Sequence, residues 1–179
     1  LHHQPRRQRQ MCIRDRRTTL LRDLGAAMSP FNAFMFIQGL ETLALRMKEH
    51  SKNGAMVAEF LQNHPKVERV SHPSVADGFK KERADNYLNG GCGGLMGFEI
   101  KGGLESGKKF IESLEMFYHV ANIGDSKSLA IHPASTTHSQ LNEEELLSGG
   151  VSPGYIRLSI GLEHIDDILE DLGNALDNS

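Results

Sequence analysis

The longest periodic stretch of the sequence runs from residue 31 to about residue 63 and has helical spacing. Ser29 and Pro30 form a strong helix start, because serine caps a first turn and proline fits the first helical position. The first half is apolar on nearly every side, so it requires burial on several sides. Only after Lys48 does the helix become amphipathic, and His64-Pro65 ends it. One small domain can hardly cover that first half, so we expect the helix to bridge two domains or a subunit interface.

Short alternating elements follow Pro65. Apolar runs bounded by turn residues predict strands at 67–70, 94–100, 118–123, 128–131 and 155–160. Helical spacing predicts helices at 77–88, 104–114, 143–147 and 164–176. This order predicts an α+β fold, a mostly antiparallel sheet with helices on one face. We expect a C-terminal domain over 64–179, preceded by an inter-domain segment and long helix over 18–63.

The first 17 residues differ from the rest in charge. They hold six arginines and one aspartate, so they carry +5 while the remainder of the −3 chain carries −8. With no periodicity and almost no apolar content, this tail is predicted to be disordered. A basic nucleic-acid arm is one interpretation, and a non-native remnant of assembly or of an unrelated reading frame is the favoured one. The acidic body has no electrostatic footprint for nucleic acid.

The two cysteines, Cys12 and Cys92, cannot form a disulfide framework and are typical of a reducing compartment. No apolar run approaches the length of a membrane span, and the start lacks the apolar centre of a signal peptide. The sequence therefore predicts a cytoplasmic protein with no membrane partner.

Arg157 stands in the apolar run Tyr-Ile-Arg-Leu-Ser-Ile, between a Pro-Gly turn and an acidic helix start. Because a guanidinium is costly to desolvate, it should face a carboxylate or water. A planar bidentate match favours a carboxylate-bearing ligand. An inter-strand salt bridge or an exposed strand face stays open as the alternative.

Residues 122–138 are dense in hydroxyl groups and turn formers, which suits either a ligand wall or a self-bonded polar loop. His132 and His138 lie six apart across a proline without a nearby Cys or acidic pair, so we expect no metal site. Ser159 lacks the glycine that precedes the serine of a nucleophile elbow, so a serine hydrolase is disfavoured.

Four landmarks in register resemble the C-terminal part of the Cys/Met-metabolism family of pyridoxal-phosphate enzymes. The resemblance covers about residues 21–176, and its landmarks are residues 39–47, 98–100, 122–138 and 157–163. Within the family, residues 29–34 and 121–138 are most similar to the O-acetylhomoserine sulfhydrylase branch (the aminocarboxypropyltransferases). Asn122 favours that branch, because the lyases and cystathionine γ-synthases usually carry serine there.

The resemblance implies a fold-type I transferase in which Arg157 holds the α-carboxylate of an amino-acid substrate. Asn122 would lie beside that carboxylate, and Thr137 would line the same pocket. The family's cofactor is pyridoxal 5′-phosphate, but the domain that carries its Schiff-base lysine lies upstream and is missing. Lys127 matches a loop position rather than that lysine. We therefore expect no catalytic residue in this chain and no activity from it alone.

The parent reaction implied is a trans-sulfuration step of methionine biosynthesis, in which sulfide displaces acetate from O-acetyl-L-homoserine and yields homocysteine. The parent is expected to be a homo-oligomer, a tetramer. Cystathionine γ-synthase and methionine γ-lyase are the alternatives within the family. A non-enzymatic interaction module with a basic nucleic-acid arm is the alternative of another class.

Overall fold

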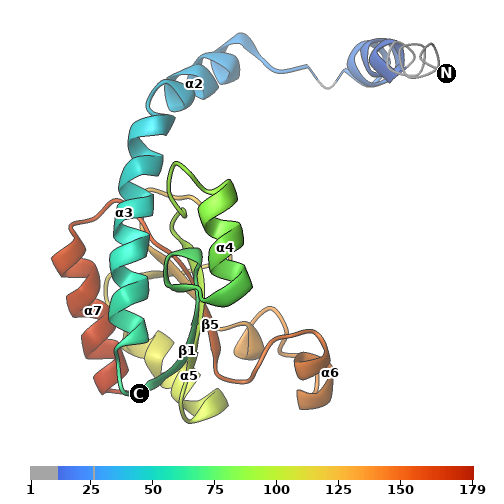
Figure 1. Cartoon of the computed structure of the whole chain (residues 1–179). Coiled ribbons are helices and arrows are strands. Elements are labelled where there is room, and N and C mark those ends of the chain that lie inside the picture. The colour runs from blue at the N-terminus through green and yellow to red at the C-terminus, as the bar shows by residue number, and fades with distance from the viewer. Residues whose placement is uncertain (1–11, 26) are drawn as a thin grey trace. The chain divides into compact units, whose positions relative to one another are not determined.

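The computed structural model describes residues 12–25 and 27–179 (Figure 1). The chain divides between Leu43 and Ala44 into two compact units. Each unit is considered by itself below.

The first unit contains two helices. Residues 12–15 are α-helical and continue into a π-helix, η1 (Arg16–Asp23), and α2 follows at Pro30–Glu41. The predicted start is confirmed, because the Ser29 hydroxyl accepts from the Asn32 amide at 3.2 Å. The predicted disorder is wrong for residues 12–17, where local bonds such as Thr18 Oγ1 to the Arg14 carbonyl (2.8 Å) satisfy a helical backbone without a core. The prediction for residues 1–11 lies outside the described residues.

The predicted helix over 31–63 is two helices, α2 and α3 (Leu43–Gln62), separated at Thr42. The φ and ψ angles of Thr42, −101° and 3°, leave the helical region, and its amide donates to the Leu40 carbonyl instead of continuing the helical ladder. Within the second unit, α3 buries one face that starts at His50 and ends at Leu61. None of the helices in residues 12–25 and 27–179 is long and apolar enough to cross a membrane.

The second unit is built on a five-stranded sheet in the order β1-β2-β5-β4-β3. The strands are β1 (Val67–Ser71), β2 (Leu95–Ile100), β3 (Tyr118–His119), β4 (Leu129–Ile131) and β5 (Tyr155–Ser159). Every neighbouring pair is antiparallel except β3 and β4, so the predicted mostly antiparallel sheet is confirmed. β3 is shorter than predicted because the Val120 amide turns back to the Tyr118 carbonyl (3.1 Å).

Three helices pack against one face of the sheet: α3, α5 (Gly103–Ser113) and α7 (Ile165–Asp177). Figure 1 shows α3 and α7 side by side over the sheet. β5 places Ile156 and Leu158 in this core with no exposed surface, and Phe98 meets Phe110 edge-on at 5.4 Å. The remaining helical segments are η2 (Pro73–Val75), α4 (Gly78–Tyr87), η3 (Pro133–Ser135) and α6 (Glu143–Ser148).

Side chains alternate across β5, as expected for a strand with one buried face. Ile156 and Leu158 point to the helices, whereas Tyr155, Arg157 and Ser159 belong to the opposite face. The helical layer therefore fixes the strand that carries Arg157, and it leaves the arginine on the face away from the core.

Candidate substrate-carboxylate site

Arg157 lies in the central strand, paired with Gly97 on β2 and Ile131 on β4. It is half-buried, and its Nη2 donates to the Asn122 carbonyl oxygen at 3.3 Å. Among residues 12–25 and 27–179, no carboxylate forms an ion pair with it, so the predicted alternative of an inter-strand salt bridge is wrong. A guanidinium has five N–H donors, and one contact to a neutral carbonyl leaves its charge unpaired. The group is therefore free to meet an anionic ligand.

Tyr155 lies beside Arg157 on the same face, and its ring crosses Gly97. A Cβ at Gly97 would overlap the Tyr155 hydroxyl, so only glycine lets the ring lie flat across β2. The contact between these two residues was not predicted from the sequence. The glycine inside the predicted strand 94–100 was the available signal, because such glycines often mark a close approach.

Asn122 begins a loop, residues 122–128, that returns to the end of β5. Its own Oδ1 accepts from the Ile123 amide at 2.9 Å, and the Gly124 amide donates to the Ser159 hydroxyl at 3.1 Å. Ser159 is buried, so it anchors this loop. The structure thus brings together two of the three predicted site residues, Arg157 and Asn122.

Thr137 is exposed and follows η3, and its hydroxyl is hydrogen-bonded to His138 Nδ1 at 2.8 Å. Within the described residues, no hydrogen bond joins Thr137 to Arg157 or Asn122. The three residues share the general region of β4 and β5, but only the first two are in contact.

His132 holds the segment that carries Thr137. It is fully buried, its Nε2 donates to the Pro153 carbonyl at 2.7 Å, and its Nδ1 accepts from the Ser135 hydroxyl at 2.9 Å. Burial lowers the pKa of His132, and the bond to Pro153 opposes this only in part. The neutral ring thus links η3 to the turn that precedes β5. Among the described residues, no cluster of three or more His, Cys, Asp or Glu could hold a metal ion.

Lys127 is the lysine nearest to the predicted clamp in sequence, and it does not fit a Schiff-base role. Its Nζ lies 3.1 Å from the Tyr118 hydroxyl and 4.5 Å from the centre of that ring. The bond to Tyr118 raises the pKa of Lys127, whereas an amine that attacks a carbonyl needs a lowered pKa. The side chain is engaged, exposed and cationic, so the chain offers no attachment for pyridoxal phosphate at this position.

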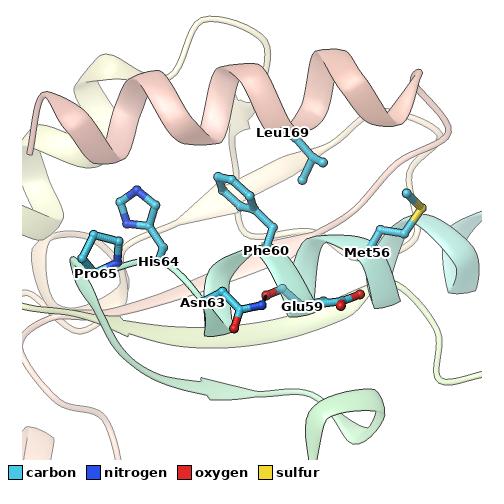
Figure 2. Close-up of a pocket in the computed structure, with 7 residues that line it drawn as sticks. All are labelled: Met56, Glu59, Phe60, Asn63, His64, Pro65 and Leu169. Atoms are coloured by element: carbon cyan, nitrogen blue, oxygen red, sulfur yellow. Dashed lines mark hydrogen bonds between the residues drawn. The ribbon is translucent and has the colours of Figure 1, made fainter.

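Two hollows in the second unit lie apart from these residues. One, of about 450 Å³, is an apolar groove between α3 and α7, where Leu169 lies next to Phe60 and His64 lies on the other side of the Phe60 ring (Figure 2). The other, of about 920 Å³, lies between β1, η2 and α4 and reaches Tyr155. Neither is lined by Arg157, Asn122 or Thr137. In this chain the predicted clamp is therefore an open surface of the sheet rather than part of either hollow.

Relatives of the chain share one activity class. An O-acetyl-L-homoserine sulfhydrylase from Leptospira meyeri is 59% identical over 159 residues, which is 88% of this chain and 36% of the relative. A homocysteine synthase from Schizosaccharomyces pombe is 44% identical over 90% of this chain and 38% of its own length. The chain thus spans little more than a third of the relatives it matches.

A solved structure is also similar to this chain over most of its length. The crystal structure of a protein from Campylobacter jejuni described as an O-acetylhomoserine (thiol)-lyase superposes with a TM-score of 0.81 at 46% identity. It covers 91% of this chain, which equals 39% of that structure, and it carries a pyridoxyl-lysine phosphate. The family model for Cys/Met metabolism PLP-dependent enzymes matches residues 7–177. The predicted resemblance and fold class are therefore confirmed, and the chain belongs to the Cys/Met-metabolism family of pyridoxal-phosphate-dependent enzymes.

Proposed function

We propose that this chain is the C-terminal part of an enzyme that converts O-acetyl-L-homoserine and sulfide to homocysteine and acetate. The names of the relatives support this activity for the whole protein. Residues 64–179 would form the substrate-clamp domain, and residues 18–63 the inter-domain segment. We keep the proposal that residues 1–17 are largely non-native, although the family model matches from residue 7 onward.

The observation that carries the proposal is the unpaired guanidinium of Arg157. The helical core fixes its strand, one backbone carbonyl accepts from it, and within the described part of the chain no carboxylate forms an ion pair with it. A substrate's α-carboxylate would complete a bidentate pair with the remaining donors. Such a pair fixes the orientation of the neighbouring Cα–H bond, whose proton must leave in this class of reaction.

Asn122 and Thr137 are proposed to complete the carboxylate pocket. The carbonyl of Asn122 already holds one edge of the guanidinium, so its side chain stands next to any bound carboxylate. Thr137 would supply a hydroxyl from the neighbouring segment. That hydroxyl now bonds to His138, so it must turn away from His138 to meet a ligand.

The parent's cofactor is proposed to be pyridoxal phosphate, which would supply the electron sink for proton removal. Lys127 does not fit its attachment, and the resemblance to the family implies a Schiff-base lysine in the upstream domain. We expect no activity from the chain alone and no saturable absorbance change when pyridoxal phosphate is added. A band that saturates and disappears in Lys127→Met would contradict this assignment.

Cystathionine γ-synthase and methionine γ-lyase activities remain the alternatives, and Asn122 is the residue that favours the sulfhydrylase. In an active parent, Asn122→Ser should move the ratio of sulfide-dependent replacement to elimination. An unchanged ratio would mean that Asn122 does not distinguish the sulfhydrylase from the two alternatives.

We further propose that the parent is a homo-oligomer, a tetramer, located in the cytoplasm. The two free cysteines, Cys12 and Cys92, are compatible with a reducing compartment.

A chimera tests the function directly. Residues 18–179 replace the matching C-terminal part of the Leptospira meyeri relative, and homocysteine formation from O-acetyl-L-homoserine and sulfide is measured. We expect sulfide-dependent homocysteine and acetate. A chimera that binds pyridoxal phosphate but forms neither product would overturn the proposed activity.

A further inference from the structure

The carboxylate of Glu163 binds a single residue, Ser128, with both of its oxygens. Oε1 accepts from the Ser128 amide at 2.6 Å, and Oε2 accepts from the Ser128 hydroxyl at 2.9 Å. Ser128 has no exposed surface, so its amide and hydroxyl depend on protein partners. A charged acceptor on two buried donors is among the stronger contacts available to a loop.

The contact closes a compact ring of bonds. The Ser128 hydroxyl also accepts from the Gly161 amide at 2.9 Å, and the Leu162 amide donates to the Ser126 carbonyl at 2.8 Å. A Cβ at Gly161 would overlap backbone atoms of Ser126 and Lys127, so glycine is needed for this close approach. Residues 126–128 therefore pack closely against residues 161–163.

Helix α3 fixes residues 160–163 from the core side. His50 Nδ1 donates to the Ile160 carbonyl at 2.7 Å, and Asn53 Nδ2 donates to the carbonyls of Gly161 (3.3 Å) and Glu163 (3.1 Å). Asn53 has no exposed surface. The backbone of Glu163 is thus held by hydrogen bonds to α3. The position of its carboxylate therefore depends on the core and not on the loop.

Hydrogen bonds rather than the hydrophobic core hold the loop, and some of them reach β3: Lys127 Nζ lies 3.1 Å from the Tyr118 hydroxyl, and the Tyr118 amide donates to the Ser128 carbonyl at 3.0 Å. Residues 121–127 are all exposed and contribute nothing to the hydrophobic core. Apart from the Glu163 ring, the loop's contacts with the β5 strand are Gly124 to Ser159 and Asn122 to Arg157, at 3.1 and 3.3 Å. Several hydrogen bonds therefore fix residues 126–128, whereas the Asn122 end of the loop is held to β5 by the two bonds at 3.1 and 3.3 Å.

We infer that Glu163 is a positioning residue for the carboxylate clamp: by holding Ser128 it keeps the Asn122 carbonyl against the Arg157 guanidinium. The inference rests on the proposed function for the meaning of the clamp. In this role Glu163 acts through the loop 122–128 and not by contact with the substrate. Its loss should therefore weaken substrate binding more than turnover.

Hydrogen exchange on the full chain tests whether Glu163 holds the loop 122–128 in place. Glu163→Ala should speed exchange of the Gly124, Ser128 and Leu162 amides by about tenfold or more, because bonds to a charged acceptor are lost. The core amides of Phe98 and Ile156 should exchange as before. Glu170→Ala, an exposed glutamate on α7, is the matched control. Unchanged exchange at Gly124 and Ser128 would overturn the inference, and so would equal acceleration at the core amides, which indicates general destabilisation.

Kinetics of the chimera test whether Glu163 affects substrate binding through Arg157. Glu163→Ala should raise KM for O-acetyl-L-homoserine about tenfold with a smaller change in kcat, and Glu163→Gln should recover part of the loss by keeping one acceptor. Because Glu163 acts through Arg157, Glu163→Ala should add little in an Arg157→Lys background. Full additivity would overturn the inference. An inactive parent chimera would instead count against the proposed function, and exchange on the chain would still decide whether Glu163 holds the loop.

Discussion

Arg157 and Asn122 are joined by a single bond, from the guanidinium Nη2 to the Asn122 carbonyl oxygen at 3.3 Å. They are 35 residues apart in the chain and belong to a central strand and an exposed loop. The bond orients the guanidinium without neutralising it. An arginine held in this way is ready for a carboxylate, and none of the described residues supplies one in an ion pair.

Arg157→Lys should abolish most of the clamp while keeping its charge. A lysine ammonium cannot form the planar two-bond match with a carboxylate. In the chimera, we expect KM for O-acetyl-L-homoserine to rise roughly tenfold to a hundredfold, the range for a lost charge-assisted bond of about 1.5–3 kcal/mol. Steady-state kinetics measure this. Arg83→Lys, an exposed arginine on α4, should leave KM unchanged, and a KM equal to that of the parent in Arg157→Lys would remove Arg157 from the site.

Alternation and turn residues were sufficient to locate the sheet. The strand at Tyr155–Ser159 was predicted over 155–160, and β2 and α7 also lie within a residue or two of their predicted bounds. These features depend on neighbours in sequence, so a single chain reveals them. The position of Arg157 on the non-core face follows from the same pattern.

The anchoring of the loop could not be predicted in the same way. Glu163 and Ser128 are 35 residues apart, and their pairing depends on how β4 and β5 lie in the sheet. The helix break at Thr42 was missed for the opposite reason. It is a local change of two dihedral angles within a sequence whose spacing remains helical on both sides.

Gly97→Ala should destabilise the second unit. The added methyl group overlaps the Tyr155 hydroxyl, and the ring must leave its place across β2. Overpacking of this kind typically costs about 1–3 kcal/mol of unfolding free energy. Chemical denaturation measures the loss, and Gly97→Ala combined with Tyr155→Ala should be less than additive. Additive losses would mean that the methyl group clashes with something other than Tyr155.

Stability should fall in mildly acidic solution because of two buried histidines. Burial lowers the pKa of His72 and of His132 below 6.5, so both bind protons more readily in the unfolded chain. Their contribution is complete above about pH 6.5 and declines as the pH falls from there toward the lowered pKa of the folded state. Each histidine can add a slope of at most about 1.4 kcal/mol per pH unit.

The variants His132→Gln and His72→Gln separate these two contributions. Each removes one titrating ring, and His132→Gln can still donate to the Pro153 carbonyl. The free energy of unfolding between pH 7 and pH 5 should depend less on pH in either variant than in the parent chain. Gln62→Ala, which removes a polar side chain without a titrating group, is the control and should leave the slope unchanged. Slopes that stay parallel to the parent in both buried-site variants would assign the acid sensitivity to other groups.

The apolar surface of α2 should make the isolated chain self-associate. Phe31, Phe36 and Leu40 are 70%, 62% and 64% exposed, and α2 buries none of its side chains within the first unit. Contiguous apolar surface on this scale marks an interaction site or an aggregation liability. Sedimentation of the chain should therefore show concentration-dependent association and strong binding of a hydrophobic dye.

Changing Phe36 and Leu40 to serine should reduce both the association and the dye binding, because two large exposed side chains are removed. Gln38→Ser, a polar exposed position on the same helix, is the matched control and should change neither. In the chimera, we expect the dye signal to fall as well, since the apolar first half of the predicted helix is expected to bridge two domains or a subunit interface. A clean monomer with little dye binding in the unmodified chain would contradict the prediction, because the apolar side chains of α2 would then be shielded from solvent without a partner.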